Sequence, residues 1–538
     1  MREWWRDAVI YQVYPRSYQD SDGDGIGDLP GITARLPHIA GLGVDAIWLS
    51  PFFTSPDRDM GYDVSDYTGV NPLFGTLADF DALVVAAHEL GLRIIIDQVL
   101  SHSSIDHPWF TESRSSRDNP KADWYIWADP KADGTAPTNW LSVFGGSAWA
   151  FDPKRRQYYM HNFLTEQPDI NFHCAAAVDA LLETMRFWLD RGVDGFRLDT
   201  VNFFTHDALL RDNPPSDWTI FPGNPYEAQN AIYSKTQPEN LNILRRMRAL
   251  TDSYPDRMMV GEVGEMGVRQ VEIMGEYTTG PDLLHMAYSF AMLSHDHTPA
   301  HFRQTIQTFL NVAPNGWPCW SFSNHDVQRH VTRWTKPGGD TDALARQSIA
   351  LLASFPGTLN LYQGEELGQT ETEITRAELR DTANIAFWPE YKGRDGCRTP
   401  MTWDNTQPNA GFSTGTPWLP VKPPQAAHAL NTQTGNNSVL ASYRAALGFR
   451  KQNKALRLGT TDFLDLPEPL FGIVRVIGAE RLTGLFNLSD VSQSLSLTGP
   501  ATLTGPQNGS LTGTTITLPP HGYVFLQSAG AVLLNLKT

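Results

Sequence analysis

Short runs of hydrophobic residues recur along most of the chain and are separated by longer stretches of mixed polarity. Eight runs are rich in β-branched and aromatic residues, which predicts buried strands over residues 8–15, 45–51, 93–100, 195–199, 258–263, 284–290, 318–326 and 358–364. Between most of them lie stretches of helical period, such as Leu77 to Gly91 and Val178 to Gly192, each closed by a glycine that suits a helix C-terminus. Apolar strands that alternate with amphipathic helices predict a parallel sheet covered by helices.

Eight strand–helix units predict an α/β fold, a closed (β/α)8 TIM barrel whose active site lies at the C-terminal ends of the strands. The third strand is followed by about seventy residues rich in Trp, Asp, Pro and Asn, far more than an ordinary loop, which predicts an inserted domain. After about Leu456 the pattern changes to alternating hydrophobic and polar residues with turn signals, typical of an antiparallel β-sandwich. We expect a barrel over 1–103 and 174–455, an inserted domain over 104–173 and a β-sandwich domain over 456–538.

Composition narrows the possible partners. The 538 residues include 42 Lys and Arg against 59 Asp and Glu, a net charge of −17 that repels nucleic acid and anionic membrane surfaces alike. No apolar run approaches the roughly 18 residues of a spanning helix, and the N-terminus lacks a signal-peptide pattern. Three scattered cysteines argue against a disulfide framework. We therefore expect a cytoplasmic protein with no nucleic-acid or membrane partner.

An acidic loop, DSDGDGIGD, follows the first predicted strand. It brings four carboxylates and one backbone carbonyl into an arrangement that favours Ca²⁺ or Mg²⁺. The loop resembles the first part of an EF-hand, but its twelfth position is Gly31 rather than a bidentate Glu. A solvated acidic turn is the alternative, although carboxylates this close repel one another without a cation. The predicted ligands of a structural metal ion are Asp20, Asp22, Asp24, Ile26 and Asp28.

Carboxylates also stand at the ends of four predicted strands. They are Asp97, Asp199, Glu262 and Asp326. Hydrolysis of a glycosidic bond needs two carboxyl groups, one that attacks or activates water and one that protonates the leaving oxygen. A single Asp at a strand end has an alternative role as the N-cap of the next helix, so each residue alone is ambiguous.

Taken together, the motifs around these residues resemble the α-amylase family, glycoside hydrolase family 13. The four ordered regions of that family are matched by IDQVLSH (96–102), GFRLDT (195–200), GEVGE (261–265) and SNHD (323–326), and its additional region by QPDINF (167–172). The opening segment, GYDVSDY (61–67), YQGEELG (362–368) and GRDGCRTPM (393–401) further resemble its α-glucosidase and oligo-1,6-glucosidase branch. The likeness runs in order from residue 4 to about 455.

The resemblance implies a role for each of the three principal carboxylates. Asp199 is the expected nucleophile, Glu262 the general acid/base, and Asp326 the carboxylate that stabilises the distorted sugar. Arg197 lies two residues before Asp199 on the same strand face, so we expect it to lower the pKa of the nucleophile. Glu262 must stay protonated until it is used, which calls for apolar surroundings. The family retains anomeric configuration through a glycosyl-enzyme intermediate.

The resemblance also implies residues that hold the substrate. His102 and His325 are expected to bind hydroxyls of the sugar in the cleavage subsite, and Tyr62 to stack on it. Asp63 and Arg398 are expected to grip the far side of the terminal sugar and close the pocket, which makes an exo-acting enzyme. Three further aromatic residues are candidates for the pocket wall, although core packing is the alternative for each: Phe144, Phe163 and Phe290.

Two positions depart from the pattern of the family. Ser101 precedes the histidine of the first region where the family often has Asn, which removes an amide donor. Thr200 follows the expected nucleophile where the α-1,6-specific branch typically carries Val, which favours α-1,4 disaccharides such as maltose. The long loop from Leu209 to Tyr233 is a candidate lid over the acceptor subsite.

The expected protein is a retaining, exo-acting α-glucosidase that releases glucose from short, maltose-like substrates and also transfers glucosyl groups to acceptors. The alternatives with the same carboxylates are an oligo-1,6-glucosidase, a sucrose hydrolase or phosphorylase, and a trehalose synthase. A catalytically dead heavy-chain-like subunit is disfavoured because all three carboxylates are present. We expect no organic cofactor, and either a monomer or a homodimer.

Overall fold

The eight predicted strands form one barrel. The computed structural model describes residues 3–220, 222–381, 385, 388–389, 391–528 and 534–536. Within them, eight parallel strands pair in the order β11-β10-β9-β5-β2-β1-β13-β12, and a parallel bridge between Ala287 and Pro318 joins the two ends of that order. The strands are β1 Val9–Val13, β2 Ala46–Leu49, β5 Arg93–Gln98, β9 Gly195–Leu198, β10 Met258–Val263, β11 Met286–Ser289, β12 Cys319–Trp320 and β13 Thr358–Tyr362. The barrel prediction is confirmed.

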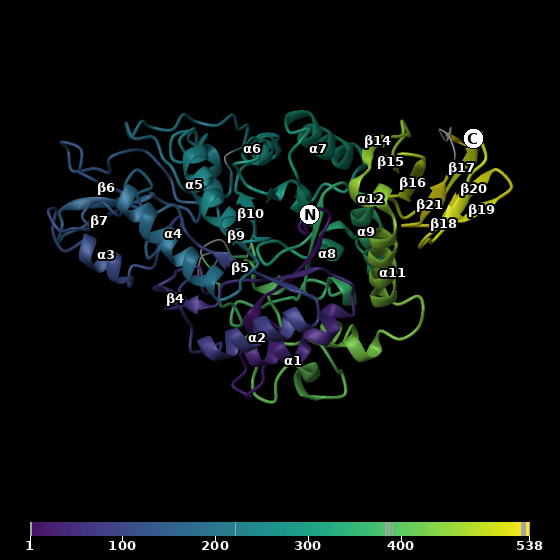
Figure 1. The fold of residues 1–538 in the computed structure, drawn as a ribbon, viewed down its shortest axis with the longest axis horizontal. Coiled ribbons are helices and arrows are strands. Elements are labelled where there is room, and N and C mark those ends of the chain that lie inside the picture. The colour runs from purple at the N-terminus through teal and green to yellow at the C-terminus, as the bar shows by residue number, and fades with distance from the viewer. Residues whose placement is uncertain are drawn as a thin grey trace.

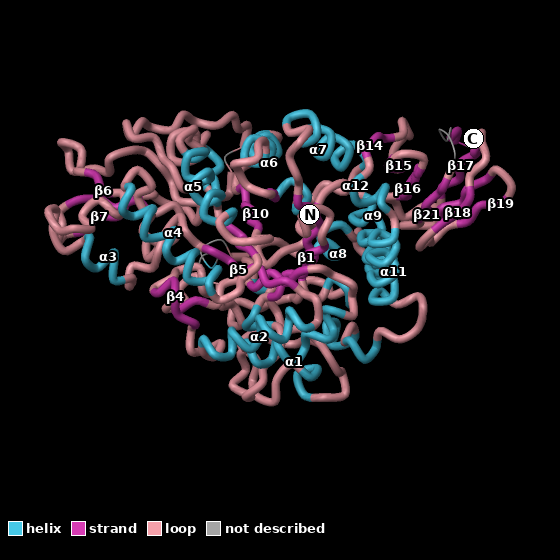
Figure 2. The backbone as a smooth tube through the Cα atoms, in the orientation of Figure 1, coloured by secondary structure: helices cyan, strands magenta, loops and turns pink. Residues whose placement is uncertain are grey.

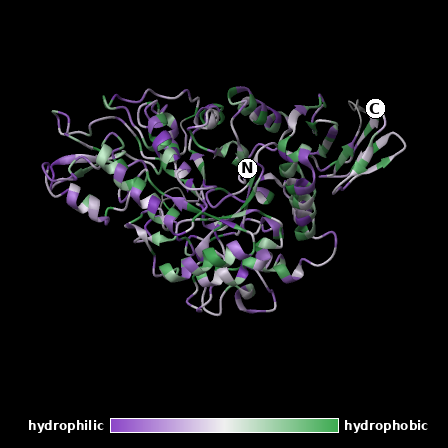
Figure 3. Cartoon of the chain, viewed as in Figure 1, coloured by the Kyte–Doolittle hydropathy of each residue, from purple (hydrophilic) through white to green (hydrophobic). Residues whose placement is uncertain are grey.

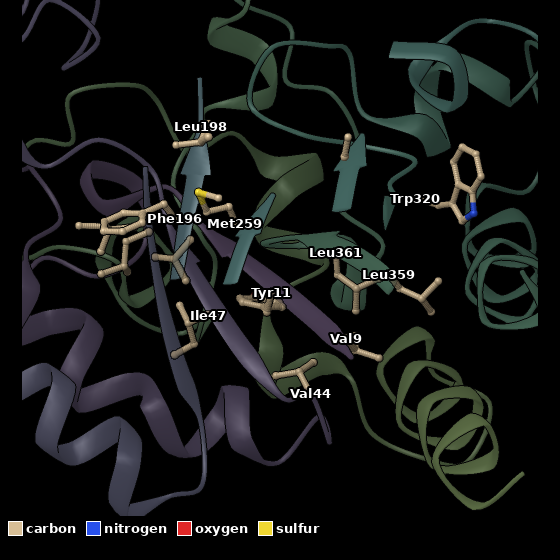
Figure 4. Packing of buried hydrophobic residues seen from close by; sticks show 14 of the residues in the cluster. Val9, Tyr11, Val44, Ile47, Phe196, Leu198, Met259, Trp320, Leu359 and Leu361 are labelled. Atoms are coloured by element: carbon tan, nitrogen blue, oxygen red, sulfur yellow. The ribbon is translucent and has the colours of Figure 1, made fainter. Parts of the chain in front are cut away.

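Each barrel strand is buried on both faces, which explains why its sequence is apolar throughout rather than alternating. Ile10, Trp48 and Val260 belong to one hydrophobic cluster, and the adjacent residues Tyr11 and Ile47 belong to another. Because successive side chains of a strand point to opposite faces, the first cluster fills the barrel and the second packs beneath the helices. Figure 4 shows part of the second cluster, with Tyr11 and Ile47 among the labelled side chains.

Helices surround this barrel. In the view of Figure 1, α1 and α2 lie along the bottom, α4 and α5 to the left, and α9 and α11 to the right; Figure 2 marks the helices in cyan around the magenta strands. The longer helices are α1 Leu29–Ala40, α2 Leu77–Glu89, α4 Ala175–Asp190, α5 Asn240–Asp252, α6 Arg269–Thr278, α7 Pro299–Val312, α9 Thr341–Ser354 and α11 Val439–Gln452. Shorter ones are α3 Pro108–Ser113, α8 His330–Trp334, α10 Pro423–Ala427 and α12 Lys454–Leu458.

The ends of α2 show how local sequence determines a helix. Thr76 accepts a hydrogen bond from the backbone of Asp79, and the Asp79 side chain accepts one from the backbone of Thr76, which is a capping box. Gly91, just beyond the helix, has a φ of 76°, a left-handed conformation that glycine adopts without strain. Gly192 has a φ of 90° in the same place after α4. Both helices predicted from the sequence are confirmed.

Two irregular additions rise above the barrel near its C-terminal strand ends. β3 (Phe53–Thr54) and β4 (Asp66–Val70) pair antiparallel and hold the segment 55–65 between them. After β5, α3 and a three-stranded antiparallel sheet follow, in the order β6 (Trp127–Ala128), β8 (Gln157–Met160) and β7 (Trp149–Asp152). This second addition has its own hydrophobic cluster around Trp140 and Trp149 and lies at the left of Figure 1.

The C-terminal strands form two antiparallel sheets, at the right of Figure 1. One contains β14 Thr460–Phe463, β15 Leu470–Ile477, β16 Glu480–Asn487, β21 Tyr523–Gln527 and β18 Thr502–Thr504; the other contains β19 Ser510–Thr512, β20 Thr515–Leu518, β17 Gln493–Leu497 and β22 Leu534–Leu536. Leu485 and Leu526 of the first sheet share a buried cluster with Leu495 and Ile516 of the second. The predicted β-sandwich is therefore confirmed as part of the fold class.

Hydropathy follows this architecture. Figure 3 shows hydrophobic colour along the central strands and mixed colour on the surrounding helices, as expected when helices present one apolar stripe to a sheet. Among the residues that the structure describes, no helix combines the length and the apolar character that crossing a bilayer requires.

Candidate active site

The C-terminal ends of the barrel strands open into a cavity of about 860 Å³. Asp199 follows β9, Glu262 lies within β10, and Asp326 lies in the loop after β12; all three line this cavity. Strand β12 is shorter than predicted, since residues 321–326 leave the sheet and turn, with the Asn324 side chain accepting a hydrogen bond from the backbone of Asp326. Six other predicted residues line the same cavity: Tyr62, His102, Phe144, Phe163, Thr200 and Phe290.

Arg197 is the centre of the carboxylate cluster, although it is fully buried beneath the cavity. Its Nη1 lies 2.7 Å from Oδ1 of Asp199 and 2.8 Å from Oδ1 of Asp97, and its Nη2 lies 2.6 Å from Oε2 of Glu262. Nη2 also donates to the hydroxyl of Tyr288, at 2.8 Å. One positive charge thus serves three carboxyl groups. Because all three contact the same guanidinium, Asp199 and Glu262 lie close together.

The ratio of one guanidinium to three buried carboxyl groups determines how the cluster is protonated. Burial raises the pKa of Asp199 to about 7, and Arg197 only partly offsets that effect. Burial likewise raises the pKa of Glu262 to about 7, with the same partial offset. Contact with Arg197 lowers the pKa of Asp199, as expected. The pKa of Asp199 is nevertheless raised overall, because the effect of burial is larger. With one cation among three buried acids, the cluster retains a proton at neutral pH.

Asp326 has the opposite electrostatic surroundings. Burial raises its pKa, but His325, Arg394 and Arg398 lower it by more, so the pKa of Asp326 lies below its usual range. Arg398 Nη2 is 3.0 Å and Arg394 Nη1 3.3 Å from its Oδ1. Asp326 therefore stays ionised at a pH where burial favours the protonated forms of Asp199 and Glu262.

The two predicted histidines lie at different depths. His102 lines the cavity, with its Nδ1 2.9 Å from the hydroxyl of Ser101, and burial lowers the pKa of His102 to about 4, so it is neutral. His325 does not line the cavity and is fully buried. Its Nε2 lies 2.6 Å from the hydroxyl of Tyr62 and its Nδ1 2.8 Å from Nε2 of Gln12. The structure thus places His325 behind Tyr62 rather than at the cavity surface.

Asp63 and Arg398, the two residues expected to grip the terminal sugar, each have protein partners in the structure, and no hydrogen bond or ion pair joins them there. Asp63 is fully buried, and its carboxylate accepts hydrogen bonds from the Ser55 hydroxyl at 2.9 Å and from the backbone of Arg58 and Asp59 at 3.1 and 3.0 Å. It holds its own loop in shape. Arg398 is also fully buried and donates to Asp326 and to the backbone carbonyl of His325. Neither residue lines the cavity.

Asp59 and Arg394 form the ion pair at the cavity wall that sequence reasoning missed. Both line the cavity, and Arg394 Nη2 lies 2.8 Å from Oδ1 of Asp59. Asp381 holds Arg394 from the other side, 2.8 Å from its Nε, and Gln167 donates to Oδ2 of Asp59 at 3.0 Å. Each missed residue is four positions before the one predicted, within or beside the same motif. The motifs located the two loops, but not which side chain of each faces the cavity.

Thr200 and Ser101, the two departures from the family pattern, contact each other. Their hydroxyl oxygens are 2.9 Å apart, and Thr200 also donates to Oδ2 of Asp199 at 3.2 Å. The backbone N–H of Thr200 donates to Oε2 of Glu262 at 3.1 Å. A φ of 42° is unusual for a β-branched residue, so these contacts offset local strain.

The long loop after β9 forms part of the cavity rim. Gly223, Asn224, Tyr226 and Glu227 line the cavity, and the Asn224 amide donates to the backbone carbonyl of Val143 in the segment after β5, at 2.7 Å. Phe221, at the middle of the loop, lies outside the described residues. The loop therefore contributes to the cavity wall, as the lid hypothesis requires.

The acidic loop does not line the cavity. Within the loop, Asp20, Asp22 and Asp28 each offer an oxygen within 4.8 Å of the others. Asp24 is outside this group, and its Oδ1 accepts the backbone N–H of Ile26. The loop is already well ordered, since Asp28 caps α1 and Asp20 accepts three backbone N–H bonds. Three of the five predicted ligands thus form a group of hard oxygens of the kind that Ca²⁺ and Mg²⁺ bind.

Comparison with known proteins identifies the family. The family model described as "Alpha amylase, catalytic domain" matches residues 12–459, most of the chain. The chain belongs to the α-amylase family. As a member of the α-amylase family with the barrel and carboxylates described above, it is a glycoside hydrolase.

Individual relatives narrow its position in the α-amylase family. A probable alpha-glucosidase of Rhizobium meliloti (strain 1021) is 56% identical over 504 residues, which cover 92% of this chain and 91% of the relative. An oligo-1,6-glucosidase of Parageobacillus thermoglucosidasius is 37% identical over 527 residues, 91% of each chain. The solved structure of XgtA, an alpha-glucosyl transfer enzyme, matches with a TM-score of 0.94 at 50% identity, covering 98% of this chain and 100% of that one. The predicted α-glucosidase and oligo-1,6-glucosidase branch is confirmed.

Proposed function

We propose that the protein is a retaining, exo-acting α-glucosidase that removes the terminal non-reducing glucosyl residue of short α-1,4-linked substrates such as maltose. One observation carries this proposal: Asp199, Glu262 and Asp326 surround a single cavity, and Arg197 joins the first two. The family and the relatives named above support the same reaction class. The cavity is also the right size for a small glycoside, since ligand sites typically span about 300–1,000 Å³.

In the first step, an Asp199 oxygen attacks the anomeric carbon while the bond from that carbon to the glycosidic oxygen breaks. Glu262 transfers its proton to the departing oxygen, so a glucosyl–Asp199 ester and a free alcohol result. At neutral pH the buried cluster retains a proton. When Glu262 carries it, this is the proton that passes to the glycosidic oxygen. In the second step, Glu262 takes a proton from water, which attacks the same carbon and releases Asp199.

Asp326 has a separate role in this scheme. Positive charge develops on the sugar ring in the transition state, and an ionised carboxylate beside the ring stabilises it. The arginines that lower the pKa of Asp326 keep it ionised throughout the pH range in which Glu262 must hold a proton. His102, Tyr62 and the aromatic wall formed by Phe144, Phe163 and Phe290 are the proposed contacts to the sugar.

The exo mode rests on the Asp59–Arg394 pair. Arg394 is held by Asp59, Asp326 and Asp381 together, and its guanidinium lies 5.4 Å from the ring centroid of Phe144. A charged side chain anchored at three points is a rigid wall. We propose that this wall ends the subsite for the terminal sugar and prevents a longer chain from passing through.

We propose a preference for α-1,4 linkages from Thr200, whose hydroxyl lies beside the nucleophile.

A second activity, glucosyl transfer, is favoured by the likeness to XgtA and by the retaining mechanism, because an alcohol can replace water in the second step. We further propose Ca²⁺ or Mg²⁺ at the acidic loop in a structural role, and a reducing, cytoplasmic setting in which all three cysteines stay free. A monomer or homodimer remains our expectation.

The test is glucose release from maltose, isomaltose, sucrose, trehalose and maltotriose in parallel. The anomeric form of the first product is followed by NMR with maltotriose, from which the first glucose released comes only from the non-reducing end. We expect maltose to be preferred, α-glucose to appear first, and transfer products to rise with acceptor concentration. β-Glucose as the first product would overturn the retaining mechanism. A preference for isomaltose would overturn the inference from Thr200, and one for sucrose or trehalose would favour the corresponding alternative enzyme.

A further inference from the structure

A buried tyrosine, Tyr288, contacts both the central arginine and the proposed acid/base. It lies on β11, beside β10, with its side chain in the barrel interior, and only 3% of it is exposed. Its hydroxyl oxygen is 3.0 Å from Oε1 of Glu262, 2.8 Å from Nη2 of Arg197 and 3.2 Å from Nε of Arg197. Because Tyr288 does not line the cavity, it has no route to the substrate itself.

The direction of these hydrogen bonds follows from the groups themselves. A guanidinium has donors only, so Arg197 is the donor in both of its hydrogen bonds to the Tyr288 oxygen. The single O–H of Tyr288 then has one acceptor left, which is Oε1 of Glu262. Burial raises the pKa of Tyr288 well above its usual range, so the phenol keeps this proton at any working pH.

The contacts close into a ring. Arg197 Nη2 binds Oε2 of Glu262 at 2.6 Å, while Tyr288 binds Oε1, so the two oxygens of one carboxyl group are held by two partners that also hold each other. A carboxyl group held at both oxygens cannot rotate about its terminal bond without breaking a contact. The packing of the Tyr288 ring near the indole of Trp48, with 6.1 Å between ring centroids, fixes the phenol in turn.

We propose that Tyr288 is a positioning residue for Glu262, which orients the acid/base and stabilises the carboxylate that remains after the proton has left for the glycosidic oxygen. This role rests on the proposed function, since it assigns Glu262 to acid/base catalysis. Tyr288 itself neither gains nor loses a proton in the reaction. Its hydrogen bond strengthens as negative charge appears on Oε1, at the moment when the leaving oxygen takes the proton.

A substrate pair separates this role from a merely structural one. The leaving group of maltose is the O4 oxygen of its reducing-end glucose, a poor leaving group that needs a proton, whereas α-glucosyl fluoride releases fluoride and needs far less help from an acid. In Tyr288→Phe, which removes only the hydroxyl, we expect kcat/KM for maltose to fall by roughly 10- to 100-fold, part of the contribution that general acids typically make. We expect kcat/KM for the fluoride, which reports the same bond-breaking step, to fall by less than about threefold.

The pH profile supplies a second readout. The hydrogen bond from Tyr288 favours ionised Glu262, so its loss raises the pKa of Glu262, and the alkaline limb of kcat/KM moves to higher pH. Arg197, Asp97, Asp199 and Asp326 are the charged groups that also act on Glu262, and Tyr288→Phe leaves all four in place. If the variant does not fold, 3,5-difluorotyrosine at position 288 keeps the ring and strengthens the donor, so the limb must move to lower pH.

Tyr277→Phe is the matched control. Tyr277 is equally buried, and its hydroxyl accepts one hydrogen bond from Asn240, away from the cavity lining. We expect this variant to lose some thermal stability but no selectivity between the two substrates. Equal losses for maltose and the fluoride in Tyr288→Phe, or an unmoved alkaline limb, would overturn the positioning role. A wild-type enzyme that hydrolyses neither substrate would instead refute the proposed function.

Discussion

Two aspartates four residues apart, Asp59 and Asp63, provide the sharpest test of how the pocket is built. The resemblance assigns Asp63 to the sugar, whereas the structure puts Asp59 at the cavity and Asp63 inside the loop. The same change, aspartate to asparagine, applied at each position should therefore have opposite consequences. Asp59→Asn should impair catalysis with little loss of stability, and Asp63→Asn should do the reverse.

The magnitudes follow from the contacts. A hydrogen bond to a charged group contributes about 1.5–3 kcal/mol, so Asp59→Asn should lower kcat/KM for maltose by roughly 10- to 150-fold. Arg394 still has two bonds to Asp381 in that variant, which limits the structural cost. In Asp63→Asn, one amide nitrogen must face a backbone N–H that the carboxylate now accepts, at Arg58 or Asp59. Leaving that donor unsatisfied costs about 1–3 kcal/mol of the free energy of unfolding.

The assay pairs thermal unfolding with steady-state kinetics on maltose and maltotriose, both well below the unfolding temperature. We expect the Tm of Asp63→Asn to fall clearly while its kcat/KM stays within about threefold of the wild type, a change of under 1 kcal/mol. Asp59→Asn should keep its Tm and lose selectivity for the shorter substrate along with activity. If Asp63→Asn abolishes turnover at full stability while Asp59→Asn is indistinguishable from the wild type, Asp63 rather than Asp59 contacts the sugar.

Three other predictions concern the same site and the acidic loop. Asp199→Asn should remove nearly all turnover and keep the wild-type circular dichroism spectrum, and substantial residual activity would contradict its role as nucleophile. Because burial raises the pKa of Glu262 to about 7, kcat/KM should decline as pH rises through about 7 and the acid loses its proton; a plateau extending to pH 9 would show that Glu262 is not that acid. Removal of divalent ions by a chelator should lower Tm, and added Ca²⁺ should restore it in the wild type but not in Asp22→Asn; an unchanged Tm in the wild type argues against a metal at the loop.

The barrel strands were predictable because their signal is local. A strand such as Arg93–Gln98 needs only a short apolar, β-branched run, and α2 begins at a capping box formed by residues three apart. Strand ends were harder, as β12 shows: the predicted run of nine residues contains a strand of only two, Cys319–Trp320. The residues after Trp320 leave the sheet and form the turn that carries Asp326. Contacts with other parts of the fold determine where the strand ends.

Some residues of the site were likewise predictable from the sequence, and others were not. Asp199, Glu262 and Asp326 belong to motifs at strand ends, and because parallel strands of a barrel end at one rim, position along the chain was enough to bring them together. Tyr288 belongs to a plain hydrophobic run, and nothing in that run distinguishes a tyrosine whose hydroxyl binds a catalytic group from one that only packs.

The sequence by itself therefore determined the barrel, the appended β-sandwich and the carboxylates of the cavity, since each depends on spacing within one segment. Tertiary structure alone decided that Asp59 rather than Asp63 meets Arg394, a residue 335 positions away, and that Arg394 rather than Arg398 faces the cavity. It also decided the pKa values, because burial of three acids around Arg197 outweighs the attraction that a single neighbouring arginine predicts. Side-chain direction in loops and the balance between desolvation and charge both depend on every element packed nearby, and no single segment contains that information.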